Sequence, residues 1–225
     1  MPLSGWQINY YNMIKDWNFN NSWIVENFDS HVREQLPWYD FATQTTCLIA
    51  KNYLRNGGLV YDIGASTGNI GRAMCGLLRD RNASLVAIEE SGEIAKNYTG
   101  GGEMVVGDAV DHQYASFSVA ICFLSLMFIH PSKRSALLSK LISSAEVGGC
   151  IIVVDKQVPP SGYLGTVFRR LTMEWKLIGG AKQGELSSKE LSLSGIQRPI
   201  LINEMNSKFT EFFRIGEFAG WVMET

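Results

Sequence analysis

Short apolar runs alternate with segments of helical periodicity through the middle of the chain. Five runs are apolar at nearly every position, which is typical of strands buried on both faces of a sheet; they cover residues 59–64, 84–88, 103–106, 118–124 and 150–155. Residues 43–55, 71–79 and 131–145 instead repeat apolar positions with the spacing of a helix. Strands that alternate with helices predict an α/β fold with a Rossmann-like, doubly wound parallel sheet.

The C-terminal part of the chain departs from this alternation. Residues 163–178 predict a further helix, and the polar, Gly- and Ser-containing stretch 179–195 follows it. Two apolar runs, 209–215 and 218–223, then surround Gly216-Glu217, as the strands of a hairpin do. We therefore expect a mostly parallel seven-stranded sheet with a C-terminal antiparallel hairpin.

The length of 225 residues allows one large domain with decorations. Residues 1–42 are rich in Trp, Tyr and Asn, and we interpret them as an N-terminal lid or lead-in segment. Residues 43–225 are interpreted as the domain that binds the ligand.

Composition and charge narrow the classes of function. The chain is 46% hydrophobic and 19% charged, as globular proteins are, and its net charge of −2 gives no overall attraction to phosphates, so direct nucleic-acid binding is not expected. No apolar run reaches the roughly 18 residues of a membrane span, and the N-terminus lacks a signal-peptide pattern. We expect a soluble, cytoplasmic protein that acts on a small molecule and not at a membrane. The four cysteines stand singly, without a C-x-x-C pair, so no metal site is expected.

The segment from Asp62 to Gly68 lies where the first strand turns into a helix. An open α/β sheet leaves a crevice for ligands at the carboxyl ends of its strands, and the first strand opens onto it here. Gly64, Ala65 and Ser66 would let the backbone approach a nucleoside closely, and the helix N-terminus offers N–H groups to a carboxylate. The spacing of the glycines does not reproduce the G-x-G-x-x-G fingerprint of dinucleotide sites, which favours a mononucleoside ligand over NAD.

Acidic residues stand at the ends of three successive strands. Asp62 ends the first, Glu89 with Glu90 ends the second, and Asp108 follows the third. Glu89 has the position of a carboxylate that accepts hydrogen bonds from both ribose hydroxyls. Asp108, together with the backbone N–H of Ala109, could read an adenine edge. This combination predicts a site for an adenosine-containing ligand.

These features resemble the class I methyltransferases that depend on S-adenosylmethionine (SAM). Within that superfamily the chain most resembles the carboxy-SAM synthase family, which acts in the modification of wobble uridine in tRNA. The stretches that carry this resemblance run through nearly the whole chain in the family's order: Phe28-Asp29-x-x-Val32, Pro37-x-Tyr39, Val60-Tyr61-Asp62-Ile63-Gly64-x-Ser66, Pro131-Ser132-x-Arg134-x-Ala136-Leu137-Leu138, Gly148-Gly149, Asp155-Lys156 and Gln197-Arg198.

The resemblance implies ligand contacts, a reaction and an assembly. Arg198, the candidate catalytic residue, would meet the carboxylate that is unique to carboxy-SAM. In the family prephenate supplies the carboxyl group, its decarboxylation feeds a sulfonium ylide of SAM, and the enzymes are homodimers. Phe123 stands where the family has an Asn near the cofactor. The candidate contacts of SAM, carboxy-SAM or S-adenosylhomocysteine (SAH) are Tyr39, Asp62, Gly64, Ala65, Ser66, Glu89, Glu90, Asp108, Ala109 and Phe123.

Two other functions stay open at this point. A conventional SAM-dependent methyltransferase acting on a small molecule or a nucleobase would need a proton acceptor, for which the sequence offers His112, His130 and Tyr39. A non-catalytic SAM-binding partner of a larger complex would need none. Arg198 could also be a surface residue paired with an acid such as Glu204, and Lys176 could belong to the solvated face of its helix.

Overall fold

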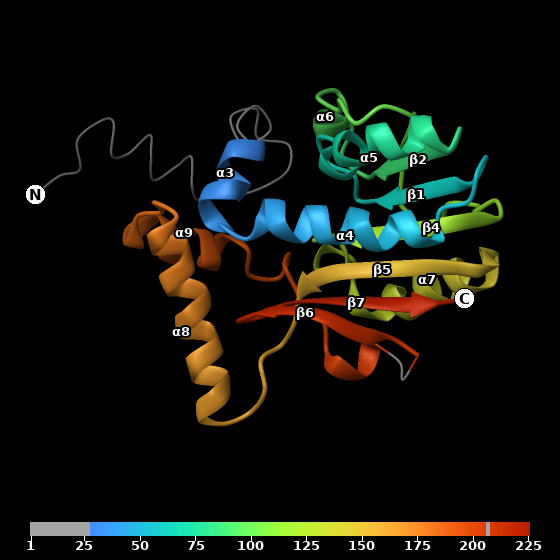
Figure 1. Cartoon of the computed structure of the whole chain (residues 1–225). Helices are drawn as coiled ribbons and strands as arrows, with labels where there is room; N and C mark the ends of the chain where they lie inside the picture. The colour runs from blue at the N-terminus through green and yellow to red at the C-terminus, as the bar shows by residue number, and fades with distance from the viewer. Residues whose placement is uncertain (1–27, 206–207) are drawn as a thin grey trace, which may run out of the picture.

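The computed structural model describes residues 28–205 and 208–225 (Figure 1). Trp6, Trp17 and Trp23 of the expected lead-in segment lie outside the described residues. None of the described helices is long and apolar enough to cross a membrane.

Seven strands form one sheet in the order β3-β2-β1-β4-β5-β7-β6. Strands β1 to β5 pair in parallel, whereas β7 runs antiparallel to both β5 and β6. The expected seven-stranded, mostly parallel sheet with a C-terminal antiparallel hairpin is therefore confirmed. The strands are β1 (Leu59–Ile63), β2 (Ser84–Glu89), β3 (Glu103–Val106), β4 (Phe117–Phe123), β5 (Ala145–Lys156), β6 (Thr210–Ile215) and β7 (Phe218–Glu224).

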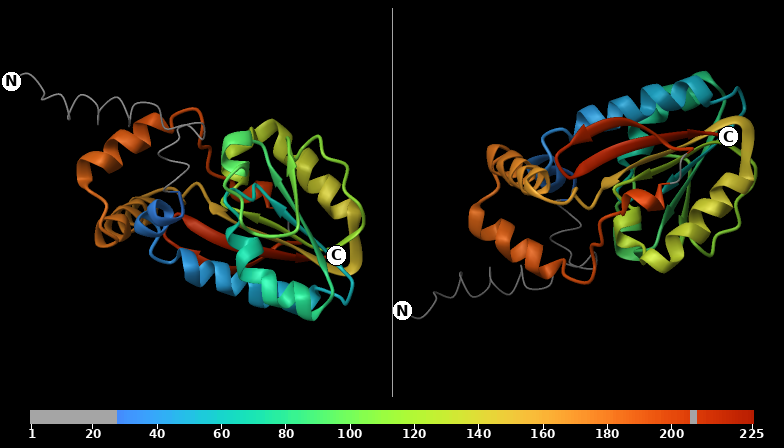
Figure 2. Two further views of the ribbon diagram at one scale, coloured as in Figure 1. Left: turned by 90° about the horizontal axis from the view of Figure 1, so that it is seen from above. Right: turned by 90° about the horizontal axis from the view of Figure 1, so that it is seen from below.

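Helices cover both faces of the sheet (Figure 2). Helices α4 (Tyr39–Tyr53) and α5 (Asn69–Asp80) lie on one face, and α7 (Pro131–Ser144) lies on the other. Each face has its own hydrophobic cluster, and both clusters take residues from β4, whose seven residues are all buried. A central strand with two buried faces needs apolar residues at every position, which explains the continuous apolar runs of the sequence.

The elements outside these layers gather at the carboxyl edge of the sheet. Helix α8 (Tyr163–Ile178) packs against α3 (Phe28–Gln35), and α9 (Gln183–Ser192) follows α8 beside that edge (Figure 1). The remaining short elements are α6 (Gly92–Ala95), η1 (Leu126–Phe128) and η2 (Ile202–Glu204).

Two segments differ from the sequence expectation. The expected boundary after residue 42 falls inside α4, which begins at Tyr39 because Tyr39 and Ala42 are buried against the sheet. Trp38, just before α4, packs on Phe218 with ring centroids 4.9 Å apart. The polar stretch 179–195 contains α9, a helix whose polar composition hides its packing on the rest of the chain through Leu186, which is 1% exposed.

Candidate functional site

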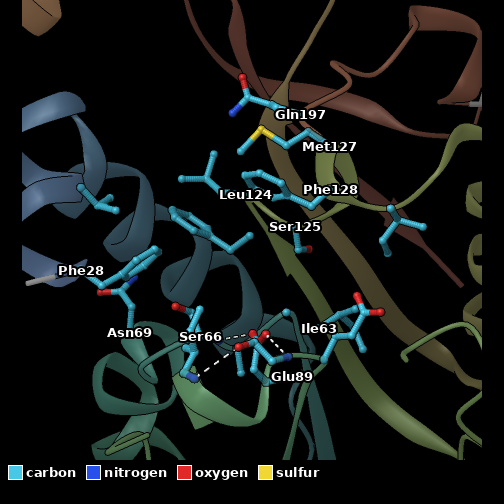
Figure 3. A pocket seen from close by; sticks show the side chains of 18 of the residues that line it. Phe28, Ile63, Ser66, Asn69, Glu89, Leu124, Ser125, Met127, Phe128 and Gln197 are labelled. Carbon is cyan, nitrogen blue, oxygen red and sulfur yellow. Dashed lines mark hydrogen bonds between the residues drawn. The ribbon is translucent and has the colours of Figure 1, made fainter. Parts of the chain in front are cut away.

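A cavity of about 580 Å³ lies at the carboxyl ends of the parallel strands (Figure 3). This is the edge at which open α/β sheets bind ligands, and the volume is that of a small-molecule site. All ten candidate cofactor-binding residues line it: Tyr39, Asp62, Gly64, Ala65, Ser66, Glu89, Glu90, Asp108, Ala109 and Phe123. The structure thus brings together residues that the sequence spreads from position 39 to position 123.

The turn after β1 contains glycines at which any side chain would force neighbouring atoms to move. Gly64 has φ +71°, and an added Cβ would lie 2.5 Å from Cβ of Ser125. Gly68 has φ +95°, and an added Cβ would lie 2.4 Å from the backbone N of Gly100. Positive φ and close approach both select glycine. The turn is consequently pressed against neighbouring loops, and its backbone lines the cavity.

Glu89 is fixed at the end of β2 by two backbone donors. Its Oε2 accepts a hydrogen bond from Ser66 N–H at 3.0 Å, and its Oε1 accepts one from Ser91 N–H at 2.9 Å (Figure 3). Burial raises the pKa of the Glu89 carboxyl, and these two hydrogen bonds act in the opposite sense. A carboxylate has about four lone-pair sites, so Glu89 can accept from a ligand hydroxyl as well as from the backbone.

Three buried polar atoms around the cavity lack a hydrogen-bond partner among the described residues: Asp62 Oδ2, Ser66 Oγ and Ser125 Oγ. All three residues line the cavity, and Asp62 is 1% exposed. Burial, together with the charge of Glu89, raises the pKa of Asp62 to about 7. Buried polar atoms without a partner are rare in proteins, so three around one cavity fit a polar ligand such as a nucleoside with an amino-acid side chain.

Asp108, which follows β3, is held by two hydrogen bonds. Its Oδ1 accepts a hydrogen bond from Val110 N–H at 2.8 Å, and its Oδ2 accepts one from Nζ of the exposed Lys133 at 2.9 Å. Burial acts to raise the pKa of Asp108, but these two hydrogen bonds outweigh it and hold the pKa below its usual value. Asp108 is therefore a carboxylate at neutral pH, beside Ala109 in the cavity wall.

The apolar wall of the cavity includes Tyr39 and Phe123, whose rings meet edge to face with centroids 5.4 Å apart. Burial raises the pKa of the Tyr39 hydroxyl well above its usual value, so Tyr39 is a poor proton acceptor at neutral pH. The other two candidate bases lie elsewhere. His112 packs on Tyr114 with centroids 4.9 Å apart, and His130 caps α7 by accepting from Ser132 N–H. Neither histidine is among the residues that line the cavity.

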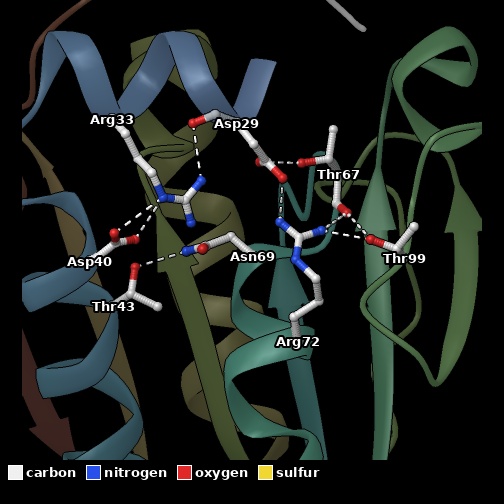
Figure 4. Close-up of polar contacts among 8 residues, drawn as sticks. All are labelled: Asp29, Arg33, Asp40, Thr43, Thr67, Asn69, Arg72 and Thr99. Atoms are coloured by element: carbon white, nitrogen blue, oxygen red, sulfur yellow. Dashed lines mark hydrogen bonds and ion pairs between the residues drawn. The ribbon is translucent and has the colours of Figure 1, made fainter. Parts of the chain in front are cut away.

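Helix α3 closes one side of the cavity and is tied to the glycine turn (Figure 4). Asp29 in its first turn accepts a hydrogen bond from Thr67 Oγ1 at 2.7 Å and forms an ion pair with Arg72 at 2.6 Å. Phe28 and Val32 of the same helix line the cavity. The segment expected to be a lid thus contributes, from residue 28 onward, a helix that is fastened over the ligand turn.

Arg198 lies next to the cavity and not in its wall. Its backbone N–H donates to Met127 O at 2.7 Å, and its carbonyl accepts from Arg134 Nη2. Met127 and Gln197 line the cavity, whereas Arg198 is not among the lining residues. Glu204, the acid that could have held Arg198 at the surface, is instead paired with Arg134 at 3.0 Å.

A group of basic residues in the cavity wall was not expected as a site. Lys156 ends β5, Lys176 lies on α8 and Lys189 lies on α9, and all three line the cavity. The interpretation of Lys176 as part of a solvated helix face is wrong, because it is 7% exposed and belongs, with Gly165 and Thr172, to the buried stripe of α8. No signal in the sequence pointed to this, because apolar residues share the helical spacing that predicts a buried face there: Leu164, Phe168, Leu171, Trp175 and Ile178.

Comparisons with known proteins support one superfamily. No family model matches the chain. The carboxy-SAM synthase of Staphylococcus epidermidis is 24% identical over 210 residues, which cover 91% of each chain. The carboxy-SAM synthase of Shewanella piezotolerans is 22% identical over 229 residues and 94% of each chain. The resemblance stated from the sequence is confirmed as a similarity over nearly the full length of these relatives.

Solved structures agree on the fold. The plantazolicin methyltransferase BpumL, in complex with SAH, matches with a TM-score of 0.62 and 12% identity over 97% of this chain and 96% of that one. A SAM-dependent methyltransferase from Clostridium acetobutylicum matches with a TM-score of 0.57 and 11% identity over 88% and 98% of the two chains. The chain therefore has the Rossmann-like methyltransferase fold.

The geometry of Glu89 predicts a specific binding defect. Replacing Glu89 by Ala should weaken SAH binding, measured by titration calorimetry, roughly 10- to 150-fold, because a charge-assisted hydrogen bond contributes about 1.5–3 kcal/mol. Glu89→Gln keeps an acceptor without the charge and should fall between Ala and wild type. Glu93→Ala, which removes an exposed carboxylate on α6, is the matched control. Unchanged affinity in Glu89→Ala would remove Glu89 from the ligand site.

The raised pKa of Asp62 predicts a pH dependence of stability. The folded protein keeps the Asp62 proton up to about pH 7, whereas the ordinary pKa is 3.8, so in this window the folded state binds more protons and stability falls as pH rises. Asp62→Asn should flatten the fall by up to about 1.4 kcal/mol per pH unit between about pH 4 and 7. Urea unfolding at several pH values measures it. Burial also raises the pKa of Asp155 to about 7. Asp155 is present in both proteins, so it contributes equally to the pH dependence of their stability. Parallel curves for the two proteins would contradict the prediction.

Proposed function

We propose that the chain converts SAM to carboxy-SAM with prephenate as the carboxyl donor. The observation that carries the proposal is the similarity to carboxy-SAM synthases over more than 90% of both lengths. The cavity supports it, since its glycine turn and its acidic strand ends are the features on which the resemblance rests.

The comparisons identify the general class of enzyme. Carboxy-SAM synthase relatives and methyltransferase neighbours that contain SAM or SAH identify a SAM-dependent transferase. Within the cavity we assign the ribose to Glu89, the adenine edge to Asp108 and Ala109, and the amino-acid end to the turn at Gly64 to Ser66. Bound SAM supplies an activated methyl group on a sulfonium, and the residues of the cavity wall would orient it.

The proposed reaction balances with prephenate. Loss of the ring carboxylate as carbon dioxide, with departure of the ring hydroxyl as hydroxide, makes the ring aromatic and leaves phenylpyruvate. The methyl carbon of SAM loses a proton, which neutralises the hydroxide to water, and forms a bond to the carbon dioxide. This balance needs no separate base, in keeping with a cavity from whose wall His112 and His130 are absent.

The two alternatives differ in what they require of the cavity. A conventional methyltransferase needs an acceptor that loses its proton, and of the three bases considered from the sequence only the buried Tyr39 is in the cavity wall. A non-catalytic binding partner requires only the cofactor contacts. The product of the reaction distinguishes both alternatives from the proposed function.

Incubation of the protein with SAM and prephenate should produce carboxy-SAM, which mass spectrometry detects as a species heavier than SAM by one carbon dioxide, together with phenylpyruvate. Omission of prephenate should abolish the product. Formation of SAH with a methylated acceptor would identify the conventional methyltransferase instead, and no turnover with retained SAM binding would identify the silent partner.

Arg198→Ala tests the residue that the resemblance assigns to the new carboxylate. An arginine about 5 Å from a sulfonium opposes it by about 3 kcal/mol at an effective dielectric constant near 20, whereas a guanidinium grips a carboxylate through two hydrogen bonds. In titration calorimetry with each ligand, Arg198→Ala should therefore lose far more affinity for carboxy-SAM than for SAM. Equal losses would make Arg198 a structural residue.

A homodimer is proposed with the exposed apolar face of α8 as its interface. Tyr163 is 74% exposed, Leu164 54% and Ile178 72%, an arrangement that a monomeric helix does not favour. The double variant Leu164→Asp and Ile178→Asp should sediment as a monomer, and wild type as a dimer. Val147→Asp is the matched control, because Val147 is 86% exposed near the start of β5, away from α8. A monomeric wild type, or a double variant that stays dimeric, would contradict the proposal.

A further inference from the structure

One buried cation joins α7 to three other segments of the chain. Arg134 lies near the start of α7 and is 1% exposed. Its Nε donates to Ile129 O at 2.9 Å, its Nη1 donates to both carboxylate oxygens of Glu204 at 3.0 and 3.1 Å, and its Nη2 donates to Arg198 O. Ile129 follows η1, Arg198 follows α9, and Glu204 ends η2. The guanidinium therefore fixes these three segments relative to one another.

Two of the three segments form part of the cavity wall. Met127 and Ile129 line the cavity from the turn around η1, and Ile196 and Gln197 line it from the segment before Arg198. Figure 3 shows Met127 and Gln197 next to each other, on the side of the cavity away from Glu89. Arg134 itself is not among the lining residues, so it can affect a ligand only through the segments that it holds.

The backbone of Arg198 is fixed on both sides of its Cα. Its N–H donates to Met127 O at 2.7 Å, and its carbonyl accepts from Arg134 Nη2. Pro199 follows, and a residue before proline avoids the helical backbone conformation. These three constraints give Arg198 a defined place beside the cavity, and they set the direction in which its side chain leaves the backbone.

Arg134 also engages the acid that follows Arg198 along the chain. The Glu204 carboxylate is held by Arg134 and accepts a further hydrogen bond from Leu201 N–H at 2.8 Å. Arg198 is half-buried, and within residues 28–205 and 208–225 its guanidinium makes no hydrogen bond or ion pair. The charge of Arg198 is thus left for a ligand, because Glu204 is already paired.

Stability alone does not account for a buried arginine at this position. Removing a guanidinium and a carboxylate from water costs much of what their ion pair contributes, and apolar residues of the same volume are often at least as stabilising. The planar guanidinium differs from other cations in its five N–H donors, which contact several acceptors at fixed angles. The arrangement around Arg134 uses this property, since its acceptors come from three different segments.

We infer that Arg134 is a positioning residue, which holds the segment around Arg198 against the turn at Ile129 through its contacts with the two backbone carbonyls. In this place Arg198 recognises the carboxylate on the transferred carbon. The inference rests on the proposed function for the identity of that ligand, carboxy-SAM. It adds a residue outside the cavity to those that determine which ligand the cavity prefers.

Titration calorimetry with carboxy-SAM and with SAM tests the role of Arg134. Wild type should prefer carboxy-SAM. Arg134→Lys keeps a positive charge beside Glu204, but a lysine cannot contact both carbonyls as the guanidinium does. This variant should lose roughly tenfold or more in affinity for carboxy-SAM, and its affinity for SAM should change by less than about threefold. Arg79→Lys, which replaces an exposed arginine near the end of α5, is the matched control and should leave both affinities unchanged.

Two variants that change Glu204 separate the carbonyl contacts from the ion pair. Glu204→Gln keeps an acceptor for Arg134 Nη1 and leaves the carbonyl contacts in place, so it should retain the preference for carboxy-SAM. The double variant Arg134→Met with Glu204→Gln removes the carbonyl contacts and leaves no buried charge without a partner. It should therefore remain folded, as measured by urea unfolding, and lose the preference.

Three results would overturn the inference. If Arg134→Lys or the double variant loses affinity for SAM and carboxy-SAM alike, Arg134 supports the fold in general. If both variants keep the preference of wild type, Arg198 does not depend on Arg134. If Glu204→Gln loses as much of the preference as Arg134→Lys, the ion pair and not the carbonyl contacts holds Arg198 in place.

Amide hydrogen exchange of residues 196–201, measured by mass spectrometry, distinguishes a failure of this inference from a failure of the proposed function. A wild type without any preference for carboxy-SAM would contradict the proposed function. Faster exchange of residues 196–201 in Arg134→Lys than in Glu204→Gln would even then support the positioning of this segment by Arg134. Exchange that is equal in wild type and both variants would contradict it.

Discussion

Gly68 and Gly100 approach each other backbone to backbone where β1 turns into α5, and the rest of the site depends on this contact. An added Cβ on Gly68 or on Gly71 would lie within about 2.5 Å of Gly100 backbone atoms, at 2.4 Å and 2.5 Å. The same turn lies against the end of β2, where Gly64 and Ala65 N–H both donate to Ile88 O and Ser66 N–H donates to the Glu89 carboxylate at 3.0 Å. It also brings Thr67 to Asp29, which fastens α3 over the cavity. The glycine turn therefore positions Glu89 and the helix that covers the cavity.

The cavity that results is electrostatically divided. Asp62, Glu89 and Asp108 end the strands on one side, where a ligand with hydroxyls, an amino group and a sulfonium finds acceptors. Lys156, Lys176 and Lys189 lie on β5, α8 and α9 on the other side. Acidic residues at one side of the cavity and amino groups at the other give it an electrostatic polarity, which orients the charged groups of a bound ligand.

The sequence was informative wherever function is carried by a local pattern. The runs at β1 to β5, the turn from Asp62 to Gly68 and the acidic strand ends were all predictable, because the end of a parallel strand places a residue at the ligand edge whatever the rest of the chain does. The three lysines of the cavity wall, Lys156, Lys176 and Lys189, were not predictable in this way. Lys176 and Lys189 are ordinary residues of polar helical segments, and only the packing of α8 and α9 beside β5 turns them inward. Arg198 shows the opposite case, since it follows the family's motif but is not in the cavity wall.

Helix α8 has an unusual distribution of residues: its buried positions are small or polar, and several of its exposed positions are apolar. An ordinary surface helix turns apolar residues inward and polar residues outward, but α8 buries Gly165, Thr172 and Lys176 and exposes Tyr163, Leu164 and Ile178. Its three buried residues contribute little apolar area, and the apolar Phe168 and Leu171 are only partly buried. Covering the outer face would supply that missing stabilisation without altering the inner one. In the proposed homodimer, α8 (Tyr163–Ile178) would hold Lys176 in the cavity wall on its inner face and contact the partner subunit on its outer face.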